Sequence, residues 1–387
     1  MSGSSEAPDG PAVPPIKRRS FLASAALAAG APATAGTAVA AERAAETAAA
    51  PQPVRRPQEA VGRGSVARLL AVPERGRGVG WLKEALQVAV ELELSTIPPY
   101  LCGWWSITDR RSEAARLIRR IVGDEMYHLG VVCNLLVAVG GRPRIRDAAP
   151  VYPGPLPGGV HPGLNVYLSG LTKSLVRDVM MAIEAPEGPL ARSAGQPPSV
   201  GAFYGDLLKT FRATKPELSR RGQLSERIGS DVLKPVGSLD AVEHSIEIIK
   251  EQGEGTAGSP ADTLRDDHPA HYYAFGEIYH GRRLRETDDG WRFAGAPVPF
   301  PDARPMARVP HGGWPHPSAR ARRLLDHFDV AYSAVLSTLD RAWDEGSHHT
   351  LQLAVHAMRG LESPAVELME IDLPDRPGVY GPQFRRR

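Results

Sequence analysis

The chain has 387 residues, enough for one large domain or two ordinary ones with a sizeable hydrophobic core. Lys and Arg number 46 against 44 Asp and Glu, so the formal net charge of +2 gives no electrostatic reason to expect nucleic acid or an acidic membrane surface as a partner. The two cysteines, Cys102 and Cys133, are too few for a disulfide framework or a thiolate zinc site. Partners must therefore be inferred from particular sites.

The N-terminal 40 residues have the layout of a twin-arginine export signal. The basic residues at 17–19 precede Phe21, Leu22 and a weakly apolar, alanine-rich run that ends at Ala40. We expect cleavage after Ala40 and export to the periplasm or the extracellular space, the alternative being a disordered Ala/Pro-rich tail. The run is too short for a membrane span, and residues 41–72 are expected to form a linker without a core.

Residues 73–387 are expected to form one domain, with helical periodicity and no clear strand alternation. Helices are expected at 81–107, 112–139, 169–185, 200–213, 238–254, 270–280, 318–345 and 348–370. Pro98 and Pro99 should kink or end the first helix, and Gly140 suits a left-handed cap after the second. A Pro- and Gly-rich loop after the second helix is long enough to cover something. The prediction is an all-α bundle with long irregular loops and additional C-terminal helices.

Two carboxylates and a histidine interrupt the apolar faces of the first two helices. At 3.6 residues per turn Glu93 falls within the apolar stripe of the first helix, whereas Glu91 falls on the opposite side and is expected at the surface. On the second helix Glu125 lies within the stripe and His128 about 60° from its centre. A buried carboxylate costs several kcal/mol unless it is paired or bound to a metal. A lone Glu-x-x-His arises by chance in many helices, but together with an inward Glu93 it is typical of di-iron and di-manganese bundles.

The second half of such a site should come from later helices. Glu184, in "MMAIEAPE", shares a face with apolar residues and is the candidate from that helix. In the helix that ends at "KEQGEGT", Glu254 lies about 80° from the apolar stripe and Glu251 about 140° away, so Glu254 is preferred while Glu251 stays open. His271, in the first turn of the next helix, is the candidate sixth ligand, with a capping or stacking role as the alternative.

Taken in order, several segments resemble the ferritin-like domain family of the iminophenyl-pyruvate dimer synthases of violacein- and rebeccamycin-type bisindole pathways. The segments are "ELELSTIPPYLCGWWSI", "DEMYHLGVVCNLLVAVGGRP", "YPGPLPGG", "MMAIEAPE", "AFYGDLL", "KEQGEGT", "HYYAFGEI" and "GPQFR". The resemblance extends from about residue 80 to 385. It implies a ferritin-like four-helix bundle and a carboxylate and histidine site for two metal ions, at Glu93, Glu125, His128, Glu184, Glu254 and His271.

The name-giving activity of that family is the oxidative coupling of two indole-pyruvate imines. There the domain belongs to a larger polypeptide with an added catalytic region, for which this chain has no room, so the resemblance does not imply the substrate. The last Glu and His also come from separate segments instead of a second Glu-x-x-His, which makes the second metal position the less certain one.

The functional expectation is an oxidoreductase in which an iron pair, with manganese as the alternative, reacts with dioxygen and oxidises or couples a small aromatic or amino-acid-derived molecule. The loop at 152–159 and the aromatic residues Tyr100, Trp104, Tyr272 and Tyr273 are candidate pocket walls. The rival expectation is an exported protein that stores metal or serves as a scaffold without turnover; a homo-oligomer is compatible with either. A zinc peptidase is disfavoured because the second helix lacks the His-Glu-x-x-His pattern: Asp, not His, stands at position 124 before Glu125.

One further expectation concerns the cysteines. If the first two helices pair antiparallel with Glu93 level with Glu125, Cys102 and Cys133 should be on the order of 20 Å apart, too far for a disulfide.

Overall fold

The computed structural model describes residues 66–186, 199–255, 259–260 and 268–387. Its helices are α1 (Val66–Leu70), α2 (Val79–Ser106), α3 (Glu113–Ala138), α4 (Lys173–Leu175), α5 (Met181–Ile183), α6 (Val200–Thr214), α7 (Leu239–Glu254), α8 (His271–His280), α9 (Ala319–Glu345), α10 (His348–Arg359) and α11 (Glu362–Leu368). A π-helical segment, Val176–Met180, joins α4 to α5, and short 3-10 turns lie at Glu74–Gly76 and Pro157–Gly159. The predicted helices are therefore present, with boundaries shifted by a few residues.

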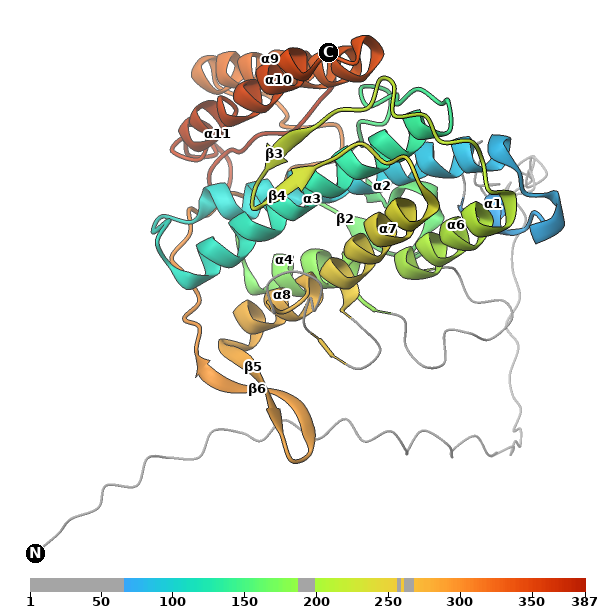
Figure 1. The fold of residues 1–387 in the computed structure, drawn as a ribbon. Coiled ribbons are helices and arrows are strands. Elements are labelled where there is room, and N and C mark those ends of the chain that lie inside the picture. Colours follow the sequence, from blue (N-terminus) through green and yellow to red (C-terminus); the bar gives the residue numbers. More distant parts are fainter. Residues whose placement is uncertain (1–65, 187–198, 256–258, 261–267) are drawn as a thin grey trace, which may run out of the picture. The chain divides into compact units, whose positions relative to one another are not determined.

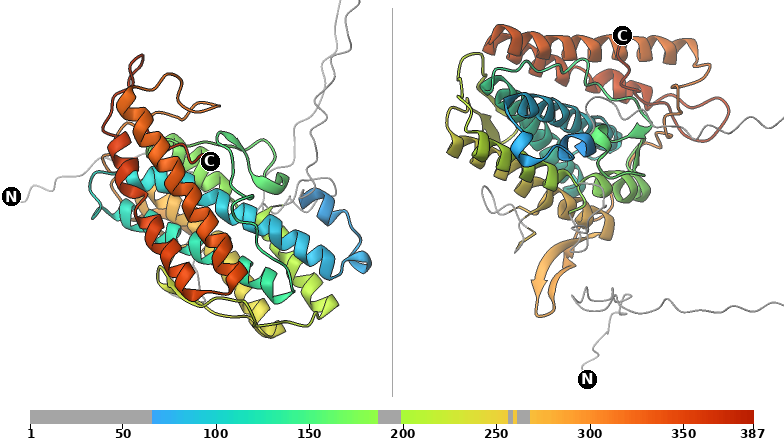
Figure 2. Two further views of the ribbon diagram at one scale, coloured as in Figure 1. Left: turned by 90° about the horizontal axis from the view of Figure 1, so that it is seen from above. Right: turned by 90° about the vertical axis from the view of Figure 1, so that its right-hand side faces the viewer.

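The described helices lie in three layers with the α2–α3 pair in the middle (Figures 1 and 2). The C-terminal helices α9, α10 and α11 cover one side of this pair, and α4–α8 cover the other side. Both central helices are buried on nearly their whole circumference, which is what apolar residues on every face predict. The central pair thus has two different internal faces.

The two prolines do not end α2, which continues to Ser106. Pro99 has no N–H to donate to the carbonyl of Ser95, four residues earlier. The Tyr152 hydroxyl, from the loop after α3, donates to that carbonyl oxygen at 2.7 Å. The long loop thus supplies the hydrogen bond that the proline removes.

The ends of α3 follow the sequence signals. The Ser112 side chain caps the first turn by accepting from the Ala115 N–H at 3.3 Å, and Gly140 adopts the left-handed conformation with φ 72° after the last turn. The helix is long and apolar enough to cross a membrane by length and composition, but it is mostly buried inside the protein, as core helices of soluble proteins are.

The prediction of an all-α fold is confirmed for the helices but missed three short antiparallel sheets. These are β1 (Gly154–Pro155) with β2 (Asn165–Val166), β3 (Glu226–Ile228) with β4 (Asp231–Leu233), and β5 (Arg282–Thr287) with β6 (Gly290–Pro297). The hairpin of β5 and β6 has no buried residue, so no apolar alternation marks it. Its signal is the turn "DDG", in which Gly290 has φ 100° and pairs with Thr287.

The start of the chain and the cysteines complete the comparison with expectation. The predicted export signal and most of the predicted linker lie outside the described residues. Helix α1 falls inside the predicted linker, yet Val66 and Leu69 are buried in the core, so the folded part begins before residue 73. Cys102 and Cys133 are both buried and free, which confirms the absence of a disulfide.

Candidate metal centre

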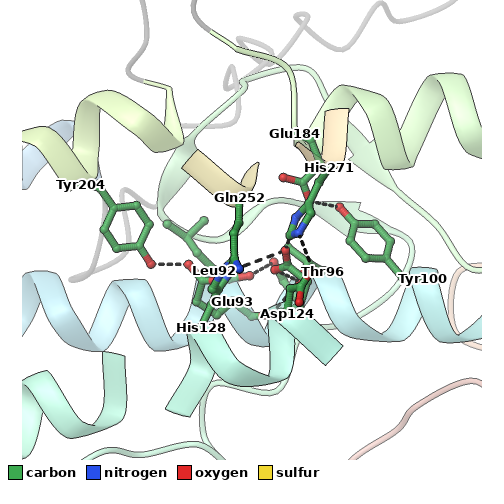
Figure 3. A network of polar contacts seen from close by, with 12 residues as sticks. Leu92, Glu93, Thr96, Tyr100, Asp124, His128, Glu184, Tyr204, Gln252 and His271 are labelled. Carbon is green, nitrogen blue, oxygen red and sulfur yellow. Dashed lines mark hydrogen bonds and ion pairs between the residues drawn. The ribbon is translucent and has the colours of Figure 1, made fainter. Parts of the chain in front are cut away.

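Five of the six predicted ligands come together between α2, α3, α5 and α8 (Figure 3). Two overlapping groups have ligand atoms that all lie within 4.8 Å of one another: Glu93, Glu125 and His128 form the first, and Glu125, Glu184 and His271 form the second. Glu125 belongs to both groups. The arrangement therefore offers two adjacent cation positions that share one carboxylate.

The three carboxylates are almost fully withdrawn from solvent. Glu93 is 4% exposed, Glu125 3% and Glu184 9%. In the described part of the chain their ion-pair partners within 4.0 Å are His128 and His271, and no Lys or Arg comes within that distance. Because buried carboxylates are costly without a cation, this donor set fits a pair of divalent metal ions.

The first histidine presents its Nδ1 atom to the carboxylates. His128 Nε2 lies 2.7 Å from Gln252 Oε1, so this nitrogen donates to the amide oxygen. Nδ1 lies 3.6 Å from both Glu93 Oε2 and Glu125 Oε1. An imidazole whose second nitrogen is held in this way has the tautomer and orientation of a metal ligand.

The second histidine has the same arrangement. His271 Nε2 lies 3.3 Å from Asp124 Oδ2, which holds the ring from behind. Its Nδ1 is 2.8 Å from Glu125 Oε1 but out of line for a hydrogen bond, and it is a buried nitrogen without a hydrogen-bond partner among the described residues. The two rings lie 5.7 Å apart between centroids. Both inward nitrogens are thus directed at the shared carboxylate without satisfying it by a hydrogen bond of good geometry.

Hydroxyl groups hold the opposite side of the carboxylates. The Tyr204 hydroxyl donates to Glu93 Oε1, and the Tyr100 hydroxyl donates to Glu184 Oε1 at 2.6 Å. The Thr96 hydroxyl lies 2.8 Å from Glu125 Oε2. In Glu93 and in Glu125, one carboxylate oxygen therefore accepts a hydrogen bond from a hydroxyl, and the other oxygen faces the imidazoles. The hydroxyls that hold the carboxylates in position carry no charge.

The pKa directions reflect competition between burial and the histidines. Burial raises the pKa of Glu93 and of Glu184. Burial also favours neutral Glu125, but the adjacent imidazoles of His128 and His271 outweigh it and hold its pKa below the ordinary value. For His128 burial alone would lower the pKa, and the adjacent carboxylates of Glu125 and Glu93 raise it to about 10. Protons on the imidazoles thus supply the positive charge that a metal would otherwise provide.

The contribution of α7 differs from expectation. Gln252, not Glu254, reaches the centre of the cluster and contacts His128. Glu254 Oε1 accepts a hydrogen bond from the Gly201 N–H at 2.9 Å in the first turn of α6, where a Cβ on residue 201 would lie 2.6 Å from the carboxylate. Glu254 lines the same cavity but belongs to neither group of ligand atoms, so its role as a ligand stays a prediction. Glu251 likewise belongs to neither group.

Helix α8 begins at His271 itself, one residue later than expected, after Ala270 and without a side-chain cap. Glu184 directly follows α5, and α5 itself follows the π-helical segment Val176–Met180. Such π-helical segments are frequent at functional sites.

A small cavity adjoins the carboxylates. Its volume is about 40 Å³, and Leu156 from the predicted covering loop forms part of its wall beside Leu92 and Ile183. This volume corresponds to one or two water molecules. The space accommodates ions and a diatomic molecule but not an aromatic or amino-acid-derived substrate beside the carboxylates.

Sequence reasoning missed the residues that orient the ligands. Asp124, Thr96 and Gln252 are buried polar residues whose partners come from other helices or the next turn. Helical periodicity could have flagged them as polar residues in buried helices, but not their partners. Tyr204 lies in "AFYGDLL", one of the segments that carry the resemblance.

The fold and the site define a helical-bundle protein with a buried cluster of Glu and His residues suited to metal ions. The sequence profile of the ferritin-like family matches residues 86–280, just over half of the chain and the part that contains all five clustered residues. The chain therefore belongs to the ferritin-like family.

Two further comparisons bear on the fold. A solved structure of a ferritin-like protein from Caulobacter vibrioides shares 22% sequence identity with this chain, covers 79% of it and 97% of its own length, and superposes with a TM-score of 0.55, which supports the fold. No curated protein matches the sequence.

Proposed function

We propose that the protein is a dimetal oxidoreductase that uses iron, with manganese as the alternative, and reacts with dioxygen. The observation that carries the proposal is the pair of ligand groups that share Glu125, each with one imidazole whose Nδ1 faces the carboxylates. Carboxylate and imidazole donors suit iron and manganese. Either metal would supply redox chemistry toward dioxygen at this position.

Each residue of the proposed site has a distinct role. Glu93 and His128 would hold one ion, Glu184 and His271 the other, and Glu125 would bridge them. Gln252 and Asp124 keep the Nε2 protons in place, so each Nδ1 lone pair is available to a cation.

The surrounding hydroxyls and the cavity complete the site. Tyr204 and Tyr100 orient Glu93 and Glu184 and hold the hydroxyl protons nearest to the carboxylates. The 40 Å³ cavity beside them has room for only one or two water molecules.

A finer proposal is that the chain is of the iminophenyl-pyruvate dimer synthase type and acts on a small aromatic or amino-acid-derived molecule. The collinear segments quoted above support it, and Lys250, which lines the cavity, is a suitable partner for a substrate carboxylate. The edge formed by α6 and α7 would have to open for such a molecule, because the cavity is too small. Purified protein supplied with indole-pyruvate imine, generated from tryptophan by an amino-acid oxidase, should yield a coupled dimer.

We also propose export through the twin-arginine route, on the strength of the basic residues and the alanine-rich run that follow one another at 17–40. The mature N-terminus should then be residue 41 in the exported fraction. Replacement of both Arg18 and Arg19 by Lys should retain the full-length chain in the cytoplasm.

The test of the metal proposal uses purified mature protein. Bound iron, manganese and zinc are measured first; ferrous iron is then added to the metal-free protein and oxygen uptake is followed with and without a reductant. The proposal expects two ions per chain and repeated turnover with reductant. Glu93→Gln should lose metal and uptake, while Glu91→Gln, two residues away on α2, should keep both. Absence of bound metal, or equal loss in the two variants, would refute it.

A second candidate function is metal storage or buffering, which the small volume of the cavity favours because it has room for ions but not for a larger substrate. Oxygen uptake that stops after one equivalent of iron is oxidised, whatever reductant is present, would support storage over catalysis.

A further inference from the structure

A second and much larger cavity lies on the other side of the α2–α3 pair. Its lining residues come mainly from these helices, from β3 and the turn after it, and from α9–α11. Its volume is about 570 Å³, which is within the range of roughly 300–1,000 Å³ for small-molecule sites. The cavity shares no lining residue with the one at the carboxylates.

The walls of this cavity are largely apolar. Ile97 and Leu101 contribute from α2, Met126 from α3, Leu336 from α9 and Met358 from α10. Flexible methionines from two layers allow the walls to adapt to the shape of a ligand. The volume equals that of about 20 water molecules, and apolar walls of this kind hold water poorly. An apolar body is therefore the chemistry that the walls favour.

Two donors in the lining have no hydrogen-bond partner in the described part of the chain. The Tyr332 side chain is 4% exposed, and its hydroxyl is buried without a hydrogen bond to any described residue. The same holds for the indole Nε1 of Trp104, which also lines the cavity. Buried polar atoms in native proteins are nearly always hydrogen-bonded, so these two call for acceptor atoms that the described chain does not supply.

The charged residues of the lining are mainly cationic. Arg119 on α3, Arg227 on β3 and Arg359 on α10 are exposed, and none has a carboxylate within 4.0 Å among the described residues. The acidic residue of the lining, Glu362, is already paired with Arg110 at 2.8 Å. The opening of the cavity therefore presents unneutralised positive charge, which favours an anionic group on the ligand.

We propose that this cavity is a binding site for an apolar carboxylic acid. The apolar part of the ligand lies between the central and C-terminal layers, its carboxylate faces the three arginines, and Tyr332 and Trp104 donate to its oxygen atoms. The proposal does not depend on the metal centre, because the two sites lie on opposite faces of α2 and α3 and have no residue in common.

Calorimetric titration of the full chain tests the proposal, with decanoate as the probe and decyltrimethylammonium, a cation with the same chain, as the comparison, both below their micelle concentrations. We expect decanoate to bind with a stoichiometry of one and the cation to bind at least about tenfold more weakly, since an ion pair with arginine is replaced by repulsion. Equal affinity for the two probes, several equivalents of decanoate per chain, or no binding would overturn the proposal.

Two double variants test whether the arginines of the lining, and not the net charge of the protein, determine the affinity for decanoate. The double variant Arg227→Gln, Arg359→Gln should lower decanoate affinity by about tenfold, because each arginine contributes a charge-assisted contact. The matched double variant Arg322→Gln, Arg323→Gln, on the exposed face of α9 and outside the lining, should bind decanoate as the parent does. Equal losses in the two double variants would overturn the assignment to the cavity.

Two variants within the cavity complete the test. Val355→Trp, at a partly exposed position of the lining, should fill the space and abolish binding, and Tyr332→Phe should lower affinity by a few-fold. Metal content and melting temperature report whether each variant folds. A folded Val355→Trp protein that binds decanoate as tightly as the parent would refute the proposal, whatever the outcome at the metal centre.

Discussion

The two internal faces of the α2–α3 pair differ sharply in chemistry, although residues on the two faces are direct neighbours in the sequence. On α2, three pairs of adjacent residues each place the first side chain at the carboxylate cluster and the second at the apolar cavity: Glu93 and Leu94, Thr96 and Ile97, and Tyr100 and Leu101. One residue turns the helix by about 100°, which is enough to move a side chain from one face to the other.

The comparison shows that each face is incomplete in a different way. On the first face the carboxylates receive hydroxyl donors but no Lys or Arg among the described residues, so among these residues only the two imidazoles can balance their negative charge. On the second face the buried donors of Tyr332 and Trp104 have no acceptor among the described residues. One face thus fits a cation and the other an anion with an apolar body. The predictions below test this difference, from the largest expected effect to the smallest.

Replacement of the shared carboxylate should affect the first face most. Glu125→Ala should lower metal affinity by more than about 100-fold, because removal of an outer partner of a metal ligand already costs 10–100-fold and Glu125 belongs to both groups. Equilibrium dialysis with ferrous iron under argon measures the change. Glu91→Ala is the control: Glu91 is half-buried, with a pKa raised by burial and opposed by Arg144, but it lies outside both groups. Equal losses would contradict the assignment of faces.

Loss of the Tyr100 hydroxyl, which donates to Glu184, should destabilise the metal-free protein. Tyr100→Phe removes the donor to Glu184 Oε1 and leaves that buried oxygen without it. The free energy of unfolding should fall by about 1–3 kcal/mol, the usual cost of a buried group left unsatisfied. Urea denaturation in the presence of chelator measures it, and an unchanged midpoint would show that the hydrogen bond is not maintained in solution.

Metal affinity should rise with pH. The pKa of His128 is raised to about 10, so below that pH the imidazole holds a proton that a metal at Nδ1 must displace. Burial raises the pKa of Glu93 and Glu184, which acts in the same direction. Each proton released increases the affinity by about tenfold per pH unit. Calorimetry in buffers of different ionisation enthalpy should detect proton release at pH 7, and decanoate binding to the other face should show none from these groups.

The smallest effect is expected on the second face. Tyr332→Phe removes a hydroxyl that makes no hydrogen bond to the described chain, so the free energy of unfolding should change by less than about 0.5 kcal/mol. The matched measurement is that of Tyr100→Phe under the same conditions. A loss as large as in Tyr100→Phe would mean that the Tyr332 hydroxyl has a partner inside the protein, and would remove one support of the proposed acid site.

Helix positions could be read from the sequence because long apolar periodicities and capping residues are local signals. Ser112 and Gly140 limit α3 as expected, and Glu93, Glu125 and His128 point inward as their positions on the stripes require. The exposed hairpin of β5 and β6 was missed because it buries no face and so has no alternation to detect.

Periodicity left Glu251 and Glu254 as the candidates on α7 and did not suggest Gln252. The Gly201 N–H, in the first turn of α6, donates to the Glu254 carboxylate, and the position of that turn is not visible in the sequence of α7. The contact between Gln252 and His128 joins residues 124 positions apart, and no local pattern encodes such a separation.

The sequence by itself determined that this protein is a helical bundle and that acids and a histidine enter its interior, because the 3.6-residue period fixes the face on which each side chain lies. Only the tertiary structure decided which nitrogen of each histidine faces the carboxylates, that Glu125 is shared, and that a large cavity lies on the opposite face. These features arise where helices distant in the sequence pack together, and a helical period specifies a face but not its partner.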